Sequence, residues 1–150
     1  MDGIRIIELP SAKMVTSGDK DLNGFDQWWS RIDRERKDRF FPRDFMWFDR
    51  ETKRPVWFYA LPEGVSDTGG YETVDFPGGL YAVAISKDGD DRDGERVYQL
   101  VKEWVQDSGC FALDEQPGRY TMFHVITSDT AFRAMGYRQL DLFIPIKTMA

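Results

Sequence analysis

The sequence predicts an α+β protein in which a strand–helix–strand–strand module occurs twice. The two modules are expected to form an antiparallel sheet with the helices on one face and a ligand pocket at the seam. Two segments repeat apolar residues at helical spacing, and shorter alternating segments surround them. Strands that follow one another without regular intervening helices favour an antiparallel sheet. The length of 150 residues suits a single domain, 1–150, built from both modules.

The first predicted module spans residues 1–62. Its helix is expected from about Phe25 to Arg36, because large apolar side chains recur there every three to four positions. Capping side chains in Asp21–Asn23 precede this helix. The predicted strands are Ile4–Ser17 (interrupted by Pro10), Asp44–Asp49 and Val56–Leu61.

The second predicted module spans residues 71–147, after a linker at about 63–70 that is rich in Gly, Ser and Asp. Its helix is expected over Glu95–Asp107, and Ser108-Gly109 is typical of a helix end. The predicted strands are Tyr71–Val74 and Leu80–Ser86, on either side of a Pro77-Gly78-Gly79 turn, then Tyr120–Thr127 and Gln139–Ile146. The predicted loops are Lys87–Asp93 and Ser128–Gly136.

Composition narrows the class of partner. A net charge of −6 without a strong basic cluster argues against direct nucleic-acid binding, which depends on grouped Lys and Arg. No apolar run is long enough to span a bilayer, and the N-terminus lacks the pattern of a signal peptide. A single cysteine, Cys110, fits a reducing cytoplasm. We therefore expect a cytoplasmic monomer or homodimer without membrane contact.

Catalytic signatures are scarce. Nucleophile-elbow, P-loop and dinucleotide-binding motifs are missing, and one His with one Cys makes a zinc site improbable, so no cofactor or metal is expected. His124 alternates onto one strand face with Tyr120, Met122 and Ile126. It is either a hydrogen-bonded structural residue or a polar group at the base of a pocket.

Aromatic residues make up 15% of the chain, which exceeds the needs of a small core and favours an aromatic-lined pocket. Trp57 and Tyr59 share one strand face and carry polar atoms, so this face is either core or pocket wall. Trp28 and Trp104 lie on the apolar faces of the two predicted helices, where a core role is favoured.

Three segments carry a resemblance to a known family: Phe76-Pro-Gly-Gly-Leu-Tyr-Ala-Val83, Glu103-Trp104 and Leu140-Asp-Leu-Phe-Ile-Pro-Ile-Lys147. Together they resemble the GyrI-like effector-binding domain, which includes ligand-binding halves of multidrug-responsive bacterial transcription regulators. The resemblance implies two modules with a pocket between them for hydrophobic, often cationic, molecules, and a buried Glu that offsets the ligand's charge. In this chain His124 stands where that acidic residue is expected, and Glu72 or Asp141 is a candidate replacement.

Three functions follow as hypotheses. The first is a freestanding binding protein for hydrophobic, aromatic, drug-like molecules. The second is a hydrolase of strained or electrophilic hydrophobic toxins, with His124 and Tyr59 as catalytic candidates. The third is a protein-interaction module that sequesters a partner such as DNA gyrase. The candidate ligand-binding residues are Trp57, Tyr59, Tyr81, Trp104, Tyr120, His124 and Phe143.

Overall fold

The structure, a computed structural model, describes residues 3–37 and 42–149. These residues divide into two compact units. Unit 1 takes the described residues of Met1–Pro10 and Pro77–Ala150, and unit 2 is Ser11–Phe76. The elements in chain order are β1 (Arg5–Leu9), β2 (Ala12–Thr16), α1 (Leu22–Arg34), β3 (Asp44–Asp49), β4 (Arg54–Ala60), β5 (Thr73–Phe76), β6 (Gly79–Lys87), α2 (Asp91–Asp107), β7 (Phe111–Leu113), β8 (Met122–Val125), α3 (Asp129–Met135) and β9 (Gln139–Thr148).

Unit 2 is an antiparallel sheet with one helix on a face. Its strands pair in the order β3-β4-β2-β5. Helix α1 begins where the Asp21 carboxylate accepts a hydrogen bond from the Gly24 amide at 3.0 Å, which satisfies one free donor of the first turn. Phe25 and Trp28 of α1 then pack onto Val15 of β2 and Tyr59 of β4.

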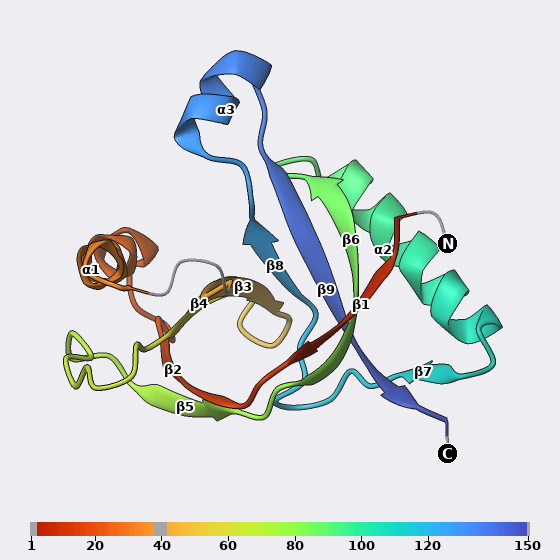
Figure 1. The fold of residues 1–150 in the computed structure, drawn as a ribbon, viewed down its shortest axis with the longest axis horizontal. Coiled ribbons are helices and arrows are strands. Elements are labelled where there is room, and N and C mark those ends of the chain that lie inside the picture. Colours follow the sequence, from red (N-terminus) through yellow and green to blue (C-terminus); the bar gives the residue numbers. More distant parts are fainter. Residues whose placement is uncertain (1–2, 38–41, 150) are drawn as a thin grey trace. The chain divides into compact units, whose positions relative to one another are not determined.

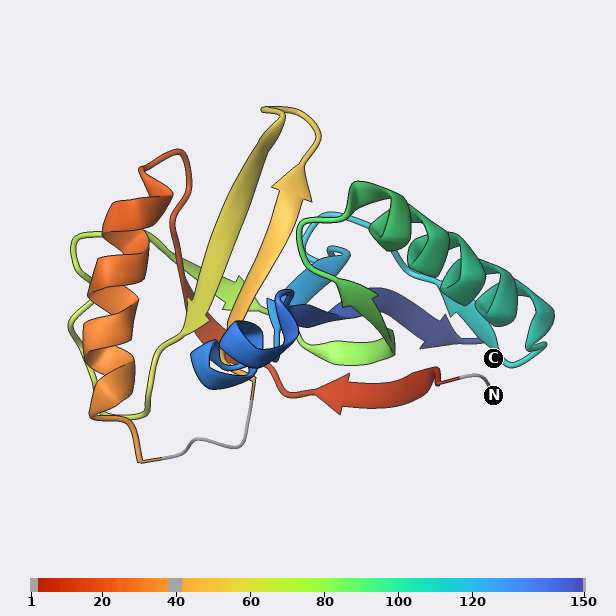
Figure 2. The same cartoon turned by 90° about the horizontal axis from the view of Figure 1, so that it is seen from above.

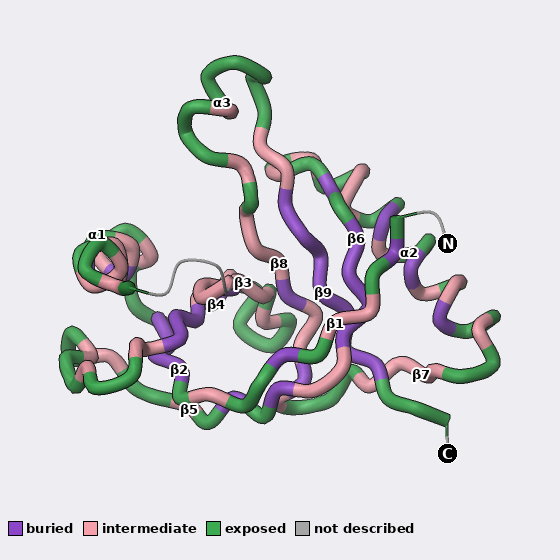
Figure 3. Tube along the Cα trace, in the orientation of Figure 1, coloured by how far each residue is buried: buried purple, intermediate pink, exposed green. Residues whose placement is uncertain are grey.

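The strands of unit 1 are also antiparallel and pair in the order β1-β6-β9-β8, with β7 paired to the end of β9. Helix α2 runs alongside these strands and contacts β6, β7 and β9 (Figures 1 and 2). Three valines on one side of α2, Val97, Val101 and Val105, pack onto Ala82, Ala84 and alternate residues of β9. Strands β6 and β9 are buried over most of their length (Figure 3).

The first strand of the chain joins the last strands in unit 1. Glu8 of β1 lies opposite Leu80 and Leu9 lies opposite Gly79 of β6. At this point a Cβ on Gly78 would lie 2.5 Å from the Leu9 carbonyl oxygen and 2.6 Å from the Pro10 carbonyl carbon. Gly78 also has φ of +68°, so both the backbone conformation and the close approach require glycine.

The predicted α+β class with antiparallel strands and packed helices is confirmed. Both units contain the order strand, helix, strand, strand, but residues 1–10 group with the C-terminal unit. The division into repeats at 1–62 and 71–147 stays a prediction. No helix among residues 3–37 and 42–149 is long and apolar enough to cross a membrane.

Two predicted loops are partly helical. Ser128–Gly136 contains α3, which projects beyond the ends of β8 and β9 (Figure 1). The Ser128 hydroxyl accepts from the Ala131 amide at 3.2 Å, and Gly136 ends the helix with φ of 82°. These caps stabilise a short helix whose side chains show little apolar periodicity.

The charged segment Lys87–Asp93 was also expected to be a loop, but α2 begins at Asp91. The Asp90 carboxylate accepts from the Asp93 amide at 3.0 Å, and acidic residues in a first turn complement the helix dipole. Other boundaries differ as well: α1 begins at Leu22 and not at about Phe25, and the predicted strand Tyr120–Thr127 shortens to β8. Strand β7 was not predicted.

Candidate functional site

The face of the unit 1 sheet opposite α2 brings three predicted ligand-binding residues together. Because side chains alternate along a strand, residues between the α2-packed positions point to this other face. Strand register places its side chains in rows. One row is Ile7, Tyr81 and Pro145; the next is Arg5, Val83, Phe143 and Met122; the third is Ile85, Asp141 and His124.

Apart from Arg5, the first two rows form an apolar floor. Tyr81, Phe143 and Met122 are each no more than 1% exposed. The Tyr81 and Phe143 rings meet edge to face with centroids 6.0 Å apart, a favourable aromatic geometry. Burial raises the pKa of the Tyr81 hydroxyl, although the nearby Arg119 charge opposes the change. Tyr81 is therefore a neutral side chain with a polar tip at physiological pH.

Arg119 fixes one end of this floor. Its guanidinium carbon lies 4.5 Å from the centre of the Tyr81 ring, within range of a cation–π interaction. The same group donates to three main-chain carbonyls and one carboxylate. The acceptors are the oxygens of Gly78 (2.7 Å), Leu80 (2.7 Å) and Ile146 (2.9 Å), and the Asp114 carboxylate (3.2 Å).

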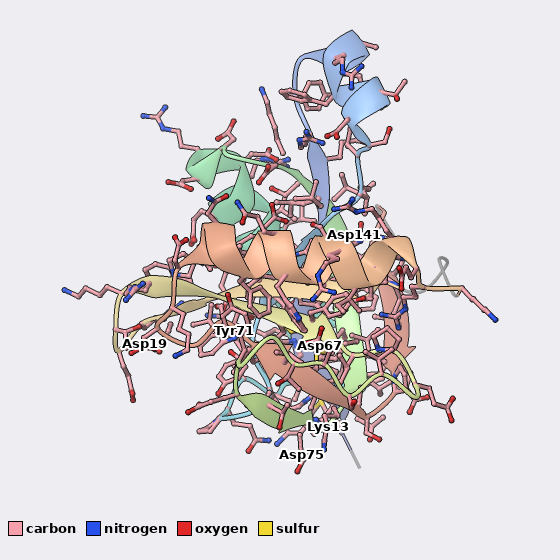
Figure 4. The ribbon with its side chains drawn as sticks, turned by 90° about the vertical axis from the view of Figure 1, so that its left-hand side faces the viewer. Lys13, Asp19, Asp67, Tyr71, Asp75 and Asp141 are labelled. Carbon is pink, nitrogen blue, oxygen red and sulfur yellow. The ribbon has the colours of Figure 1, made fainter. Side chains whose placement is uncertain are left out.

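The third row carries two polar side chains, Asp141 and His124, and is more accessible. Asp141 (labelled in Figure 4) is 7% exposed, and its carboxylate accepts from the Arg5 guanidinium at 2.6 Å. The Arg5 side chain is 49% exposed, and Ile85 in the same row as Asp141 is 50% exposed. His124 is half-buried and lies directly opposite Asp141 in the β8–β9 pairing. The face therefore changes from a buried aromatic floor to a polar end that solvent reaches.

Two other predicted residues, Trp57 and Tyr59, lie in unit 2 against α1. Trp57 packs edge to face on Trp29 with centroids 5.6 Å apart, and its indole nitrogen donates to Asp44 at 3.3 Å. Tyr59 is fully buried between Trp28 and Trp29. Both residues thus contribute to the helix–sheet core of unit 2, and their role in ligand binding stays a prediction.

The β4–β5 segment completes this aromatic cluster. Figure 4 labels Asp67 and Tyr71 on the segment alongside α1. The Tyr71 ring meets Phe25 edge to face with centroids 4.9 Å apart, and the Asp67 carboxylate accepts from Arg31 of α1 at 2.8 Å. Gly69 lies close to the Trp28 ring, since a Cβ at this position would come within 2.6 Å of an indole carbon.

The Tyr59 hydroxyl lies in a charged network. It donates to Asp33 at 3.3 Å and accepts from Arg36 at 3.4 Å. Burial raises the pKa of this hydroxyl above its usual range. Burial would also raise the pKa of Asp33, but hydrogen bonds from Arg43 and Tyr59 and the charge of Arg43 outweigh it and lower that pKa. The network stabilises a neutral tyrosine beside an ionised carboxylate.

The remaining predicted residues lie elsewhere in unit 1. Trp104 packs with the α2 core and stacks on Phe111, with centroids 6.4 Å apart, on the sheet face away from His124. Tyr120 precedes β8 and is half-buried. Cys110 is an exposed free cysteine just after α2. Across the described parts of the chain, no group of three or more His, Cys, Asp or Glu is placed to hold a metal ion.

The sequence provided part of this site. His124 followed from strand alternation, and Asp141 was named as a candidate carboxylate. Arg5 and Arg119 were missed, because each reaches its partner from a distant part of the chain: 136 positions separate Arg5 from Asp141. Only the strand pairing of β1, β6 and β9 brings Arg5 and Asp141 together.

No model of a known protein family matches the chain, and no curated protein matches it by sequence. Solved structures do match. A hydrolase from Listeria innocua has a TM-score of 0.64 at 11% identity, over 96% of this chain and 91% of its own. SAV2435, solved with bound tetraphenylphosphonium, has a TM-score of 0.54 at 11% identity, over 96% and 93%. The EcmrR C-terminal domain has a TM-score of 0.59 at 13% identity, over 97% and 98%.

The chain therefore has the α+β fold of the EcmrR C-terminal domain and of SAV2435. The resemblance to GyrI-like effector-binding domains expected from the sequence is confirmed at the level of the fold. At identities of 11–13% the likeness establishes the fold alone, since one fold supports several functions.

Proposed function

We propose that the chain binds hydrophobic, aromatic small molecules on the unit 1 sheet face that carries Tyr81, Phe143 and His124. The observation that carries the proposal is the accessible end of this face, where the half-buried His124 and the half-exposed Ile85 and Arg5 border the buried rings of Tyr81 and Phe143. Ligand sites typically combine apolar and aromatic walls with a few polar groups that orient the ligand. Aromatic rings add edge-to-face contacts to the gain from burying apolar surface.

The comparisons support this proposal. SAV2435 was solved with tetraphenylphosphonium, a molecule of four phenyl rings, and shares the fold. The EcmrR C-terminal domain shares the fold as well. We do not expect direct nucleic-acid binding, because the chain carries a net charge of −6.

Calorimetric titration with tetraphenylphosphonium and with the uncharged triphenylphosphine oxide tests the proposal. We expect at least one compound to bind at micromolar concentrations and to raise the melting temperature. At one hundred times its dissociation constant, a ligand adds about 2.7 kcal/mol to the free energy of unfolding. His124→Gln should weaken the binding, because it alters the polar end of the face.

A matched control is Arg96→Gln on the exposed side of α2, where the Arg96 side chain is 63% exposed. This variant should bind like the wild type. If neither compound binds the wild-type protein below about 100 μM, or if both variants lose binding equally, the proposed site is wrong.

Hydrolysis is a second candidate function, favoured by the fold shared with the Listeria innocua hydrolase. His124 lies opposite Asp141 across the β8–β9 pairing, and a carboxylate can orient an imidazole for general acid–base work. A screen of ester and cyclopropane substrates should then show turnover that His124→Ala abolishes. Turnover unaffected by this variant would exclude His124 as the catalytic group.

A further inference from the structure

We propose that Arg5 sets the charge selectivity of the candidate ligand site, so that the site prefers uncharged aromatic molecules to cationic ones. This inference rests on the proposed function. Its basis is that the one acidic side chain in the three rows, Asp141, is already paired with a cation of the same chain.

The geometry of the pair supports this role. Arg5 lies beside Val83 in the second row, and its guanidinium reaches across β6 to Asp141 in the third. The distance of 2.6 Å is that of a close, charge-assisted hydrogen bond. The Asp141 side chain is only 10% exposed, so an unpaired charge there would be costly.

A cationic ligand gains little at such a site. To reach the carboxylate it must replace the guanidinium, and the new ion pair substitutes for the one that is lost. An uncharged aromatic molecule at the accessible end of the face has no charge to set against the carboxylate and leaves the Arg5–Asp141 pair intact. Selectivity against cations thus follows from a pair that is already formed, since specificity depends on the difference between two binding free energies.

Arg5 is also suited to substitution. Five register pairs, from Arg5–Val83 to Leu9–Gly79, hold β1 against β6 through the main chain. The Arg5 side chain is half exposed and contributes no apolar surface to the unit 1 core. Replacing its guanidinium should therefore change the charge around Asp141 without unfolding the strand.

The experiment compares two ions of the same shape, tetraphenylphosphonium and tetraphenylborate, together with uncharged triphenylphosphine oxide. In Arg5→Gln we expect the affinity ratio of phosphonium to borate to rise at least about tenfold, which corresponds to about 1.4 kcal/mol. Affinity for the uncharged compound should stay within about threefold of the wild type. Arg5→Lys, which retains the charge, should keep a ratio close to that of the wild type.

Two controls isolate Asp141. Arg96→Gln makes the same change in net charge and also breaks an ion pair with an aspartate, Asp93. Because Arg96 lies on α2, on the other side of the sheet from Asp141, the ratio of phosphonium to borate affinity in this variant should stay near the wild-type value. The double variant Arg5→Gln/Asp141→Asn should lose the gain in phosphonium affinity. A tenfold rise that also occurs in Arg96→Gln, or that persists in the double variant, would overturn the inference.

The result separates this inference from the proposed function. If the uncharged compound binds wild type and Arg5→Gln alike but the ion ratio does not change, Arg5 does not set selectivity and the site stands. If none of the three compounds binds either protein, the proposed function itself fails.

Discussion

Replacing Arg119 with methionine should strongly destabilise unit 1. The Arg119 side chain is 10% exposed, and its guanidinium donates to the carbonyls of Gly78, Leu80 and Ile146 as well as to Asp114. Methionine retains much of the apolar stem but none of the donors. Three carbonyls would lose a donor, and the Asp114 carboxylate, 16% exposed, would lose its ion-pair partner and keep only the hydrogen bond from the Gln116 side chain at 2.8 Å.

Each buried acceptor left without a donor costs about 1–3 kcal/mol, and breaking a buried ion pair costs about 3–5 kcal/mol. These costs overlap, because neighbouring effects are not additive. We therefore expect Arg119→Met to lower the free energy of unfolding by about 3–5 kcal/mol. That loss is a large part of the about 5–15 kcal/mol that stabilises most domains.

Urea denaturation followed by tryptophan fluorescence measures this loss. Arg119→Lys keeps the charge but not the planar fork, and should retain part of the stability. Arg96→Met is the matched control, because that arginine also pairs with an aspartate but is 63% exposed, and it should change stability by less than about 0.5 kcal/mol. A loss below about 1 kcal/mol in Arg119→Met would refute the reasoning.

Two further predictions concern stability. The pKa of Asp33 is lower in the folded chain than in the unfolded one, so its contribution is full at neutral pH and falls away as the pH drops below about 4. Asp33→Asn should therefore cost about 1–3 kcal/mol at pH 7 and progressively less below pH 4 in urea titrations, and a cost that does not change with pH would contradict this. Gly78→Ala should destabilise by at least about 1 kcal/mol more than Gly89→Ala. Both glycines have positive φ, but a Cβ meets main chain only at Gly78, so equal melting temperatures would exclude the contact with Leu9.

The agreement between sequence and structure is best where the signal is local. The helix Glu95–Asp107 was predicted from apolar periodicity, and α2 ends at the predicted residue. Helix α3 was not predicted, because a seven-residue helix with caps at Ser128 and Gly136 has little periodicity to detect. For the site, alternation along β8 placed His124 and Met122 on one face, as the structure has them.

The sequence by itself determined the α+β class, the two amphipathic helices and the aromatic residues available for a site. The fold class and the helices can be predicted because they depend on the spacing of side chains within single segments of the chain. Only the tertiary structure decided that Trp57 and Tyr59 pack against α1, and that Arg5 pairs with Asp141. The register of β1 on β6 and of β6 on β9 sets that second contact, and register is fixed by which faces are buried when the whole sheet forms.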